Sequence, residues 1–400
     1  MTFAIIGGGA SGMLAAITCA QEHPMDEILL FERQSRVGRK LLATGNGRCN
    51  LSNANLSAVY YHGESLPELD SLFRAFDPLS WFHKQGLFTV TEAGGRIYPL
   101  SDSANSVLDV LRFSMEKPNL RQFLGCEVRS IKKSGEQFSI KTDNSTFTAD
   151  KLVIACGGLA GTKLGGGMSG YQLLRSFGHS CTKLFPALVQ LKTENSFVKA
   201  LKGIRADTSI RLCGRVAAEG EIQFTEYGIS GPAVFDISRD VSVNAENTVL
   251  SLDFLRDYSN DDVLNALRAR KSAFPALQAG EILTGIVHNR LGKMLVKIAQ
   301  VELEKPCGVL SEEELSQITN AAKHLQLTVI GTMGMDCAQV TAGGIRMEEF
   351  SPNTLQSKLC KGLYACGEVL DIDGDCGGYN LHWAWVSGHL AGLLKEDNND

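Results

Sequence analysis

Three glycines near the start of the sequence have the spacing that binds a phosphate group. Gly7, Gly9 and Gly12 form the pattern G-x-G-x-x-G. Ala10 and Ser11 fill its last two variable positions. The first glycine allows a tight turn, the second lets a pyrophosphate approach the backbone, and the third lets a helix pack closely against a strand. Free N–H groups in the first turn of that helix then stabilise the phosphate charge.

The residues around this motif predict the elements that would hold it in place. Residues 2–6 predict a strand, residues 11–21 a helix, and residues 27–31 a second strand. This βαβ order implies parallel strands joined by a right-handed crossover. Glu32 ends the second strand, where its carboxylate would accept hydrogen bonds from ribose hydroxyls. The sequence therefore predicts a dinucleotide site, without distinguishing NAD from FAD.

A basic, glycine-rich segment follows at 36–53, with the sequence RVGRKLLATGNGRCNLSN. A chain of this composition is able to wrap around an anionic dinucleotide while its cations neutralise phosphate charge. A solvated basic loop is the alternative. The cations are Arg36, Arg39, Lys40 and Arg48, with Gly45 between them.

A second candidate segment lies near the end of the sequence. Gly367 and Glu368 close an apolar run. Asp371 and Asp373 follow, and the sequence GDCGGYN then leads into an apolar helix. An acid after this strand would bind ribityl hydroxyls, and the helix start would stabilise the negative charge of a reduced isoalloxazine. Turn chemistry is the alternative for the two aspartates. Together, the first and last segments favour the extended cofactor FAD.

Apolar patterns elsewhere predict how the remaining chain is organised. Residues 151–155 and 362–366 have the character of buried strands and are expected in the same sheet as the first strand. From about residue 260 to 324, apolar residues recur every three or four positions, as in helices, and Ser311 with Glu314 forms a capping box. Between these parts, the sequence alternates as antiparallel strands do. The strands expected there are 188–192, 209–216, 221–225 and 248–254.

These patterns predict an α/β fold in which a discontinuous Rossmann-like FAD-binding domain carries two insertions. One insertion is a β module and the other is a small helical domain. The expected boundaries are 1–186 and 341–400 for the FAD-binding domain, 187–258 and 325–340 for the β module, and 259–324 for the helical domain.

Composition limits the classes of protein to which the chain belongs. With 44% hydrophobic and 21% charged residues over 400 positions, it is typical of a globular rather than a disordered protein. A formal charge of −5 gives no overall attraction to nucleic acid or anionic lipid. No uncharged apolar stretch approaches the roughly 18 residues of a spanning helix, so no membrane contact is expected. Eleven cysteines without C-x-x-C or zinc-site spacing predict reduced thiols, no metal and a cytoplasmic location.

At this point the sequence resembles a known family, the YhiN/BaiN group of bacterial flavoproteins, which also includes aminoacetone oxidases. The resemblance spans nearly the whole chain and is much more specific than the glycine motif alone. It implies an FAD domain, an inserted β-barrel-like domain and a small helical domain. The similar segments are residues 7–12, GRKLLATGNGRCN (38–50), FTEYGISGPA (224–233), VTAGGI (340–345) and LYACGEVLDIDGDCGGYNL (363–381).

The resemblance also implies a set of FAD contacts, carried over position by position. They come from the glycine turn, the end of the second strand, the basic segment and the last segment. Val128, on a later strand, would contact the adenosine. The complete set of expected cofactor-binding residues is Gly7, Gly9, Ala10, Ser11, Gly12, Glu32, Arg39, Lys40, Gly45, Arg48, Val128, Gly157, Gly367, Glu368, Asp373, Gly378, Asn380 and Leu381.

A second G-x-G-x-x-G pattern occurs at 165–170 and suggests a separate NAD(P)H site. However, it begins only eight positions after Gly157, and no acid at a clear strand end follows it by about twenty positions. Relatives carry a similar loop inside the FAD domain, so we interpret it as part of that domain. Relatives more often have Thr and Asp within the loop, which leaves its ligand contacts open.

Three side chains are candidates for proton transfer beside a flavin. A flavin passes a hydride through N5, so the protein must hold a substrate carbon there and supply or remove a proton. Cys49 lies in the basic loop, where cations are expected to lower the pKa of a thiol. Tyr379 and His382 lie at the start of the last helix. For all three, simple packing around the cofactor is the alternative.

The family supplies several competing reactions. Members are linked to the formation of dihydrouridine in ribosomal RNA, to the reduction of bile-acid or steroid enones, and to the oxidation of aminoacetone by O2. The first two share hydride addition to a C=C bond conjugated with a carbonyl. We therefore expect an FAD-dependent reductase that uses NADH or NADPH as its external reductant. An amine oxidase and a non-catalytic flavin-binding protein are the alternatives, and the oligomeric state is not predicted.

A local excess of cations bears on the choice between RNA and a small molecule. The segment from residue 192 to 215 contains six cations and only two acids, Glu194 and Asp207. If they lay on one face, they would suffice for salt-dependent binding to RNA phosphates, whereas scattered cations would favour a small hydrophobic substrate. A solvated surface is the other alternative. The cations are Lys192, Lys199, Lys202, Arg205, Arg211 and Arg215.

Overall fold

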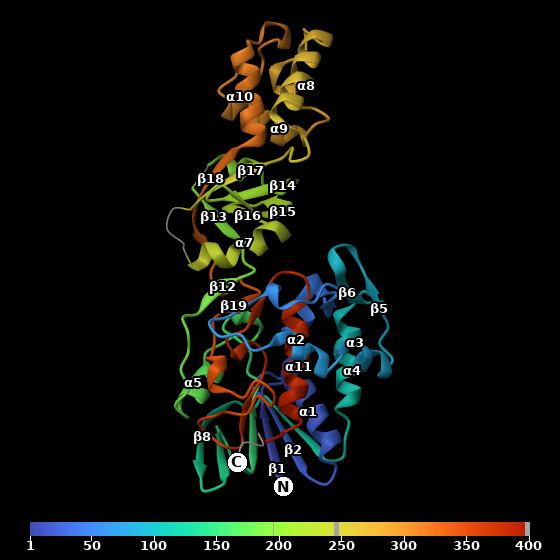
Figure 1. Ribbon diagram of the computed structural model, residues 1–400, viewed down its shortest axis with the longest axis vertical. Coiled ribbons are helices and arrows are strands. Elements are labelled where there is room, and N and C mark those ends of the chain that lie inside the picture. Colours follow the sequence, from blue (N-terminus) through green and yellow to red (C-terminus); the bar gives the residue numbers. More distant parts are fainter. Residues whose placement is uncertain (195, 244–247, 397–400) are drawn as a thin grey trace. The chain divides into compact units, whose positions relative to one another are not determined.

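The computed structural model describes residues 1–194, 196–243 and 248–396, and the chain forms two compact units (Figure 1). Unit 1 contains residues 1–186 and 335–400, so it is built from the two ends of the chain. Unit 2 contains residues 187–334. Each unit has its own hydrophobic core. The division into three domains stays a prediction.

A five-stranded parallel sheet forms the centre of unit 1. Its strand order is β20-β11-β1-β2-β7. β1 therefore lies in the middle of the sheet, with β2 on one side and β11 on the other, as in the dinucleotide-binding fold. The predicted placement of residues 151–155 and 362–366 in the sheet of the first strand is confirmed. The strands are β1 (Thr2–Ile6), β2 (Glu27–Glu32), β7 (Leu120–Leu124), β11 (Lys151–Ile154) and β20 (Leu363–Ala365).

Two helices from opposite ends of the chain pack closely against each other in unit 1. They are α1 (Ala10–Glu22) and α11 (Tyr379–Gly392), which lie side by side in Figure 1. A Cβ atom on Gly388 would lie 2.4 Å from the carbonyl oxygen of Ser11, and one on Gly392 would lie 2.5 Å from that of Ala15. Glycine is therefore required at both positions on α11 for this separation of the backbones.

Smaller elements surround the sheet of unit 1. A three-stranded sheet has the order β10-β9-β8, another has the order β3-β6-β5, and two strand pairs are β12-β19 and β21-β4. The helices are α2 (Leu69–Ala75), α3 (Pro78–Lys84), α4 (Ala104–Ser114) and α5 (Ser169–Arg175). The strands are β3 (Ser52–Asn53), β4 (Tyr61–His62), β5 (Thr89–Thr91), β6 (Arg96–Pro99), β8 (Val128–Ser134), β9 (Gln137–Thr142), β10 (Thr146–Ala149), β12 (Phe185–Ala187), β19 (Val340–Ala342) and β21 (Asp373–Gly374).

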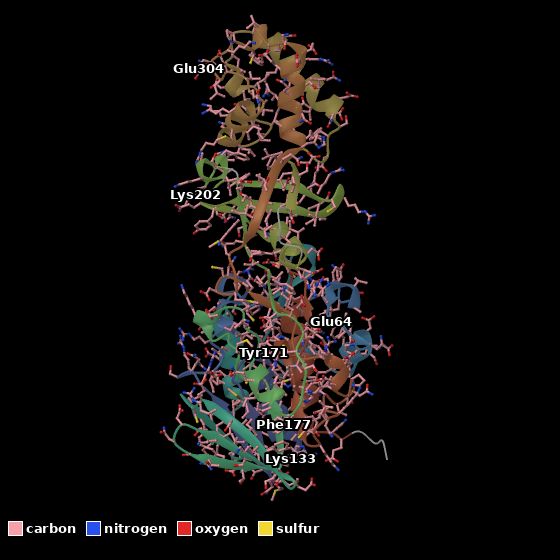
Figure 2. All side chains as sticks on the ribbon, turned by 90° about the vertical axis from the view of Figure 1, so that its left-hand side faces the viewer. Glu64, Lys133, Tyr171, Phe177, Lys202 and Glu304 are labelled. Carbon is pink, nitrogen blue, oxygen red and sulfur yellow. The ribbon has the colours of Figure 1, made fainter. Side chains whose placement is uncertain are left out.

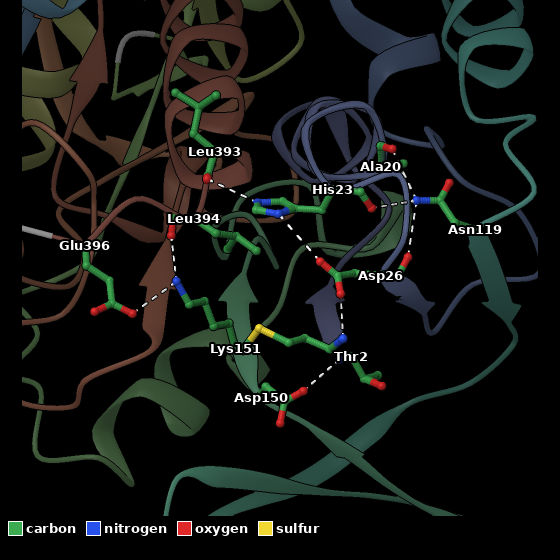
Figure 3. Close-up of polar contacts among 11 residues, drawn as sticks. Thr2, Ala20, His23, Asp26, Asn119, Asp150, Lys151, Leu393, Leu394 and Glu396 are labelled. Atoms are coloured by element: carbon green, nitrogen blue, oxygen red, sulfur yellow. Dashed lines mark hydrogen bonds and ion pairs between the residues drawn. The ribbon is translucent and has the colours of Figure 1, made fainter.

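Hydrogen bonds fix the amino-terminal edge of the central sheet (Figure 3). The side-chain amide of Asn119 donates to the carbonyl oxygens of Ala20, His23 and Asp26 at 3.1–3.2 Å. His23 lies 3.7 Å from a carboxylate oxygen of Asp26 and contacts the carbonyl of Leu393. This network joins the end of α1 to the starts of β2 and β7, at the edge opposite the glycine turn.

Unit 2 contains a closed barrel in the order β13-β16-β15-β14-β17-β18, as expected from the family resemblance. One predicted strand, 209–216, is wrong, because Cys213 and Gly214 have φ angles of 50° and 78° and turn the chain between two antiparallel strands. The strands are β13 (Leu191–Thr193), β14 (Arg205–Leu212), β15 (Arg215–Phe224), β16 (Gly228–Ser230), β17 (Thr248–Asp253) and β18 (Leu325–Thr332), and the helices of this part are α6 (Phe197–Ala200) and α7 (Pro232–Val243).

The predicted helical segment of unit 2 forms α8 (Asn260–Ala273), α9 (Asn289–Ile298) and α10 (Glu312–Lys323). The capping box of Ser311 and Glu314 is confirmed at the start of α10. At the other end of α10, Lys323 pairs with Asp253 at 2.8 Å in a buried ion pair. None of the helices in the described part of the chain is both long and apolar enough to cross a bilayer.

Candidate cofactor and active site

The carboxyl ends of the parallel strands bring the predicted cofactor segments to one edge of unit 1. Gly7 directly follows β1, and Glu32 ends β2. Gly157 comes three positions after the end of β11, and Gly367 comes two positions after the end of β20. In an open α/β sheet, ligands bind at this edge, next to the strands where the order reverses.

The glycine turn after β1 has the geometry that a pyrophosphate requires. Gly7 has a φ of 112°, and a Cβ there would lie 2.4 Å from the carbonyl oxygen of Ala155. A Cβ on Gly12 would lie 1.8 Å from the carbonyl oxygen of Gly7. At Gly9, no atom lies within 4 Å of the Cβ position, and this residue begins α1 without a side-chain cap. The N–H groups in the first turn of α1, which have no partner within the helix, therefore fit an anionic cofactor.

Glu32 has the position predicted for a ribose-binding acid. Its Oε2 accepts a hydrogen bond from the Gly8 N–H at 2.7 Å, and its Oε1 accepts one from the Gln34 N–H at 2.7 Å. These bonds fix the carboxylate beside the glycine turn, and each oxygen retains acceptor capacity for a hydroxyl. The N–H of Cys126 donates to the backbone oxygen of Glu32, so the chain leading to Val128 also lies at this strand end.

Glu368 and Lys40 form an ion pair between the last segment and the basic segment. Lys40 Nζ lies 2.7 Å from Glu368 Oε2, while the Thr341 N–H donates to Oε1 at 2.8 Å. A Cβ on Gly367 would lie 2.4 Å from Ser11 Oγ, so the last segment contacts the start of α1. The prediction that both ends of the chain meet at one site is confirmed.

Two further cations of the basic segment, Arg39 and Arg48, already have partners. Arg39 donates to the side chain of Gln34 at 2.8 Å. Arg48 pairs with Glu92 at 2.5 Å and with Asp102, and the hydrogen bonds that it donates to these two acids raise the pKa of the guanidinium. Gly45, in the same loop, has a φ of 57°. Contacts of these residues with FAD stay predictions.

The second glycine pattern packs beside the end of β2. Arg33 donates to the carbonyl oxygens of Gly165 and Gly166. The Gly167 N–H donates to the carbonyl of Gly158 at 3.1 Å. The loop therefore belongs to unit 1 and adjoins the predicted FAD segments. Sequence reasoning missed Arg33 as a residue that holds this loop. The available signal was that Arg33 directly follows Glu32 at the end of β2.

The last segment forms a tight turn before α11. Asn380 Oδ1 accepts a hydrogen bond from the Gly374 N–H at 2.9 Å, and its Nδ2 donates to the Gly374 carbonyl at 2.6 Å. Gly378 precedes α11 with a φ of 103°, and a Cβ there would lie 2.3 Å from the carbonyl oxygen of Ser52. Asp373 is buried in the turn, and Leu381 is half-buried on the first turn of α11.

Cys49 is buried, which contradicts the predicted effect on its thiol. Its side chain is inaccessible to solvent, and desolvation raises the pKa of the thiol to about 12. The expectation of a lowered pKa is wrong because the effect of burial outweighs the hydrogen bond with Thr44, which acts to lower the pKa. Whether Cys49 donates a proton to a substrate stays a prediction.

Tyr379 and His382 pack into the core of unit 1. The ring of Tyr379 stacks on Tyr60 at 4.7 Å. His382 Nδ1 contacts Ser52 Oγ at 2.9 Å, and burial lowers the pKa of the imidazole to about 4. At neutral pH His382 is therefore an uncharged ring. A catalytic role of Tyr379 or His382 stays a prediction.

A different histidine lies at the surface of this turn. His62 Nε2 lies 2.8 Å from Asp375 Oδ1, and both side chains are about one-third exposed. Sequence reasoning missed His62, because it stands outside every recognisable motif. Asp375 lies within the GDCGGYN segment, but no role was predicted for it.

A model of the HI0933-like protein Rossmann domain matches residues 1–394 of the chain. The chain belongs to the HI0933-like family. The match covers both units, so the barrel and the helical part are elements of the family and not additions to it. The predicted YhiN/BaiN resemblance is confirmed, and the protein is an FAD-dependent oxidoreductase.

Individual members of this family have been named. The chain is 41% identical to the 3-dehydro-bile acid delta(4,6)-reductase of Clostridium scindens over 399 residues, covering 97% of each chain. It is 29% identical to the ribosomal RNA dihydrouridine synthase of Escherichia coli, covering 96% of this chain and 95% of the relative. The corresponding Haemophilus influenzae protein is 27% identical, with 97% of each chain covered.

A solved structure has a similar fold. The FrdA subunit of Escherichia coli quinol fumarate reductase, in a variant form, aligns with a TM-score of 0.51 and 19% sequence identity. The alignment covers 98% of this chain and 69% of that subunit. At this level of identity, the likeness supports the Rossmann-like fold alone.

Proposed function

We propose that the protein uses NADH or NADPH to reduce a C=C bond conjugated with a carbonyl in a small molecule of the bile-acid or steroid type. One observation carries the proposal: the chain is 41% identical over almost its whole length to a protein named as a 3-dehydro-bile acid delta(4,6)-reductase. The relatives named as dihydrouridine synthases are 27% and 29% identical. A cytoplasmic location is part of the proposal.

The geometry of the carboxyl edge supports a set of cofactor-binding residues. The N–H groups at the start of α1 would hold the pyrophosphate of FAD, and Glu32 would accept hydrogen bonds from the adenosine ribose. Glu368 and the turn before α11 would hold the ribityl and isoalloxazine part. When bound, FAD supplies the hydride-transfer chemistry that no amino-acid side chain provides.

The charge pattern of unit 2 supports a small molecule over RNA. Lys202 and Lys199 both pair with Glu226, at 3.0 and 3.9 Å. Arg205 pairs with Glu221 at 3.4 Å. Lys202 projects at the periphery of unit 2 in Figure 2, where water and counterions screen such pairs. With half of the six cations paired to acids, the cluster offers fewer charges for phosphate contacts than its sequence suggests.

Anaerobic half-reactions test the proposal. The purified protein is reconstituted with FAD and reduced by NADH or NADPH, and its reoxidation is followed by flavin absorbance. We expect a 3-oxo-4-ene steroid or bile acid to reoxidise it, and the faster coenzyme identifies the physiological reductant. Undermodified ribosomal RNA serves as the competing acceptor. If RNA but no enone reoxidises the reduced flavin, the substrate is RNA and the enone assignment is wrong. If an amine reduces the flavin and only O2 reoxidises it, the protein is an oxidase.

A further inference from the structure

We propose that His62, positioned by Asp375, is the acid that protonates the substrate during reduction of the C=C bond. This inference rests on the proposed function, because it assigns a residue to that reaction. Histidine is the side chain best suited to hold and release a proton near neutral pH. The proposal concerns the pair of His62 and Asp375 and not a lone side chain.

The backbone places His62 directly beside the turn that leads into α11. β4 pairs with β21 in antiparallel register, with His62 opposite Asp373 and Tyr61 opposite Gly374. The imidazole then reaches past the end of β21 to the carboxylate of Asp375 at 2.8 Å. The start of α11 is where the isoalloxazine is proposed to bind. His62 would therefore lie on the segment that adjoins the reacting end of the cofactor.

Asp375 is itself held in place, which makes the pair preorganised. Its N–H donates to the carbonyl of Tyr60 at 3.0 Å. Asn380 Nδ2 donates to the carbonyl of Gly374 at 2.6 Å and contacts that of Asp375 at 3.4 Å. Asp375 can therefore orient the imidazole of His62, as a carboxylate does for a catalytic histidine.

The other histidines of unit 1 with carboxylate or hydroxyl partners do not fit this role. His382 is buried and uncharged, and His179 is buried between Glu349 and Ser357. His389 contacts the hydroxyl of Thr18 at 3.1 Å, which is not a carboxylate group. His23 pairs with Asp26 at the amino-terminal edge of the sheet, opposite the glycine turn. Among these histidines in the described ranges, His62 alone combines partial exposure, a carboxylate partner and a position at the carboxyl edge.

Charged groups lie on both segments around His62. On its own segment, Glu64 is paired with Arg346 at 2.7 Å. Across the strand pair, Asp373 is opposite in register, and Asp371 accepts a hydrogen bond from the Glu64 N–H. Asp375 is the acid whose carboxylate lies within hydrogen-bonding distance of the His62 imidazole, at 2.8 Å.

The proton transfer balances the proposed reduction. A hydride reaches the β-carbon of the enone, and the electron pair of the C=C bond moves toward the carbonyl. The imidazolium of His62 then gives one N–H proton to the α-carbon, which forms the second new C–H bond. Solvent water reprotonates the imidazole. Each turnover saturates one C=C bond, oxidises one NADH or NADPH and consumes one proton.

The test compares matched variants of the FAD-loaded protein. The variants are His62→Gln and Asp375→Asn, and the control is His23→Gln, which alters a histidine paired with aspartate at the opposite edge of the sheet. Cys49→Ala tests the competing acid. Four quantities are measured: the dissociation constant of FAD, the shift of the flavin spectrum on binding the enone to oxidised enzyme, the rate of flavin reduction by NADH or NADPH, and the pH profile of reoxidation by the acceptor that wild type uses.

We expect His62→Gln to keep FAD affinity, enone binding and flavin reduction close to wild type. Its reoxidation should slow by roughly 10²- to 10⁴-fold and lose the pH dependence of the wild type. Added imidazole should restore part of the rate in His62→Ala. Asp375→Asn should slow reoxidation less and displace the pH profile, because it acts through His62. His23→Gln should behave as wild type.

The outcomes separate this proposal from the proposed function. If wild type is reoxidised by neither an enone nor uridine in RNA, the proposed function fails and the role of His62 fails with it. If wild type is reoxidised and His62→Gln matches its rate, only the role of His62 is overturned. If Cys49→Ala slows reoxidation but keeps the FAD affinity, enone binding and flavin reduction of wild type, the proton is assigned to that thiol instead. Loss of FAD affinity in folded His62→Gln would make His62 a binding residue and also overturn its role as the acid.

Discussion

At the scale of single residues, Glu32 is the side chain whose geometry most directly predicts cofactor affinity. Its carboxylate is fixed by the Gly8 and Gln34 N–H groups at the end of β2. We expect Glu32→Ala to weaken FAD binding by roughly 10- to 100-fold, since hydrogen bonds to a charged group are worth about 1.5–3 kcal/mol. Fluorescence titration of apoprotein with FAD measures the change.

Glu27→Ala is a matched control for this variant. Glu27 begins the same strand and pairs with Arg121 at the surface, 2.7 Å away, at the opposite edge of the sheet. Its loss should leave FAD affinity unchanged. Equal affinity of Glu32→Ala and wild type would remove Glu32 from the ribose site, even though the residue ends the predicted strand.

His382 predicts a dependence of folding stability on acid pH. Burial lowers the pKa of its imidazole from 6.5 to about 4 in the folded protein. The unfolded chain therefore binds a proton more readily, so the stabilisation is present above pH 6.5 and is lost as the pH falls through about 4. The full effect is roughly 3 kcal/mol in the free energy of unfolding.

Urea unfolding between pH 7 and pH 4 measures this contribution. His382→Gln cannot be protonated, so its stability should fall less steeply with pH than that of wild type. His83→Gln, which alters an exposed histidine on α3, should keep the wild-type dependence. Identical slopes for His382→Gln and wild type would show that His382 is solvated in solution.

These residues also show which features of the site were predictable from sequence. The glycine turn was predictable because backbone conformation and close packing allow only glycine there. The high pKa of Cys49 was not, because it depends on burial by segments distant in sequence. The pair of His62 and Asp375 was hidden for the same reason, since 313 positions separate the two residues.

At the scale of elements, the contact between α1 and α11 joins the two ends of the chain. It depends on Gly388, whose Cβ position lies 2.4 Å from a backbone oxygen of α1. We expect Gly388→Ala to destabilise the protein by about 1–3 kcal/mol, since neither helix backbone can yield easily. The displacement of Ser11 should also weaken FAD binding. Thermal unfolding and FAD titration measure the two effects.

Ala384→Ser provides the control, because it also adds one heavy atom to α11 but at a half-buried position. It should change the unfolding temperature little. A Gly388→Ala variant as stable as this control would mean that the two helices separate without cost. The close approach would then not be needed to assemble the site.

Helices and strands were predictable where a periodic pattern of apolar residues was bounded by a glycine or a capping residue. The strand at 2–6, the helix after it and the capping box of Ser311 all follow from local residues. The strand expected at 209–216 was wrong, because apolar and β-branched residues continue across the turn at Cys213 and Gly214. No helix was expected at α7, which follows the FTEYGISG stretch and packs its apolar residues in the core of unit 2.

At the scale of the whole molecule, unit 2 is inserted between two adjacent positions of unit 1. Cys181 and Ile345 form an antiparallel bridge, and the Thr182 N–H donates to the Gly344 carbonyl at 2.8 Å. The chain therefore leaves unit 1 and returns to it at one place. A short linker can replace residues 187–334 without stretching either end, because the cost of closing a short loop is small.

We expect unit 1 closed by a glycine-serine linker to fold and to bind FAD within about tenfold of the full-length affinity, a difference of about 1.4 kcal/mol. The reason is that the glycine turn, Glu32, Glu368 and the turn before α11 all make their described contacts within unit 1. The reoxidation assay then shows whether unit 1 alone also reduces the enone. Circular dichroism, FAD titration and the reoxidation assay measure the three properties. A folded unit 1 that fails to bind FAD would show that residues of unit 2 contribute to the cofactor site, and one that still reduces the enone would place the substrate site wholly within unit 1.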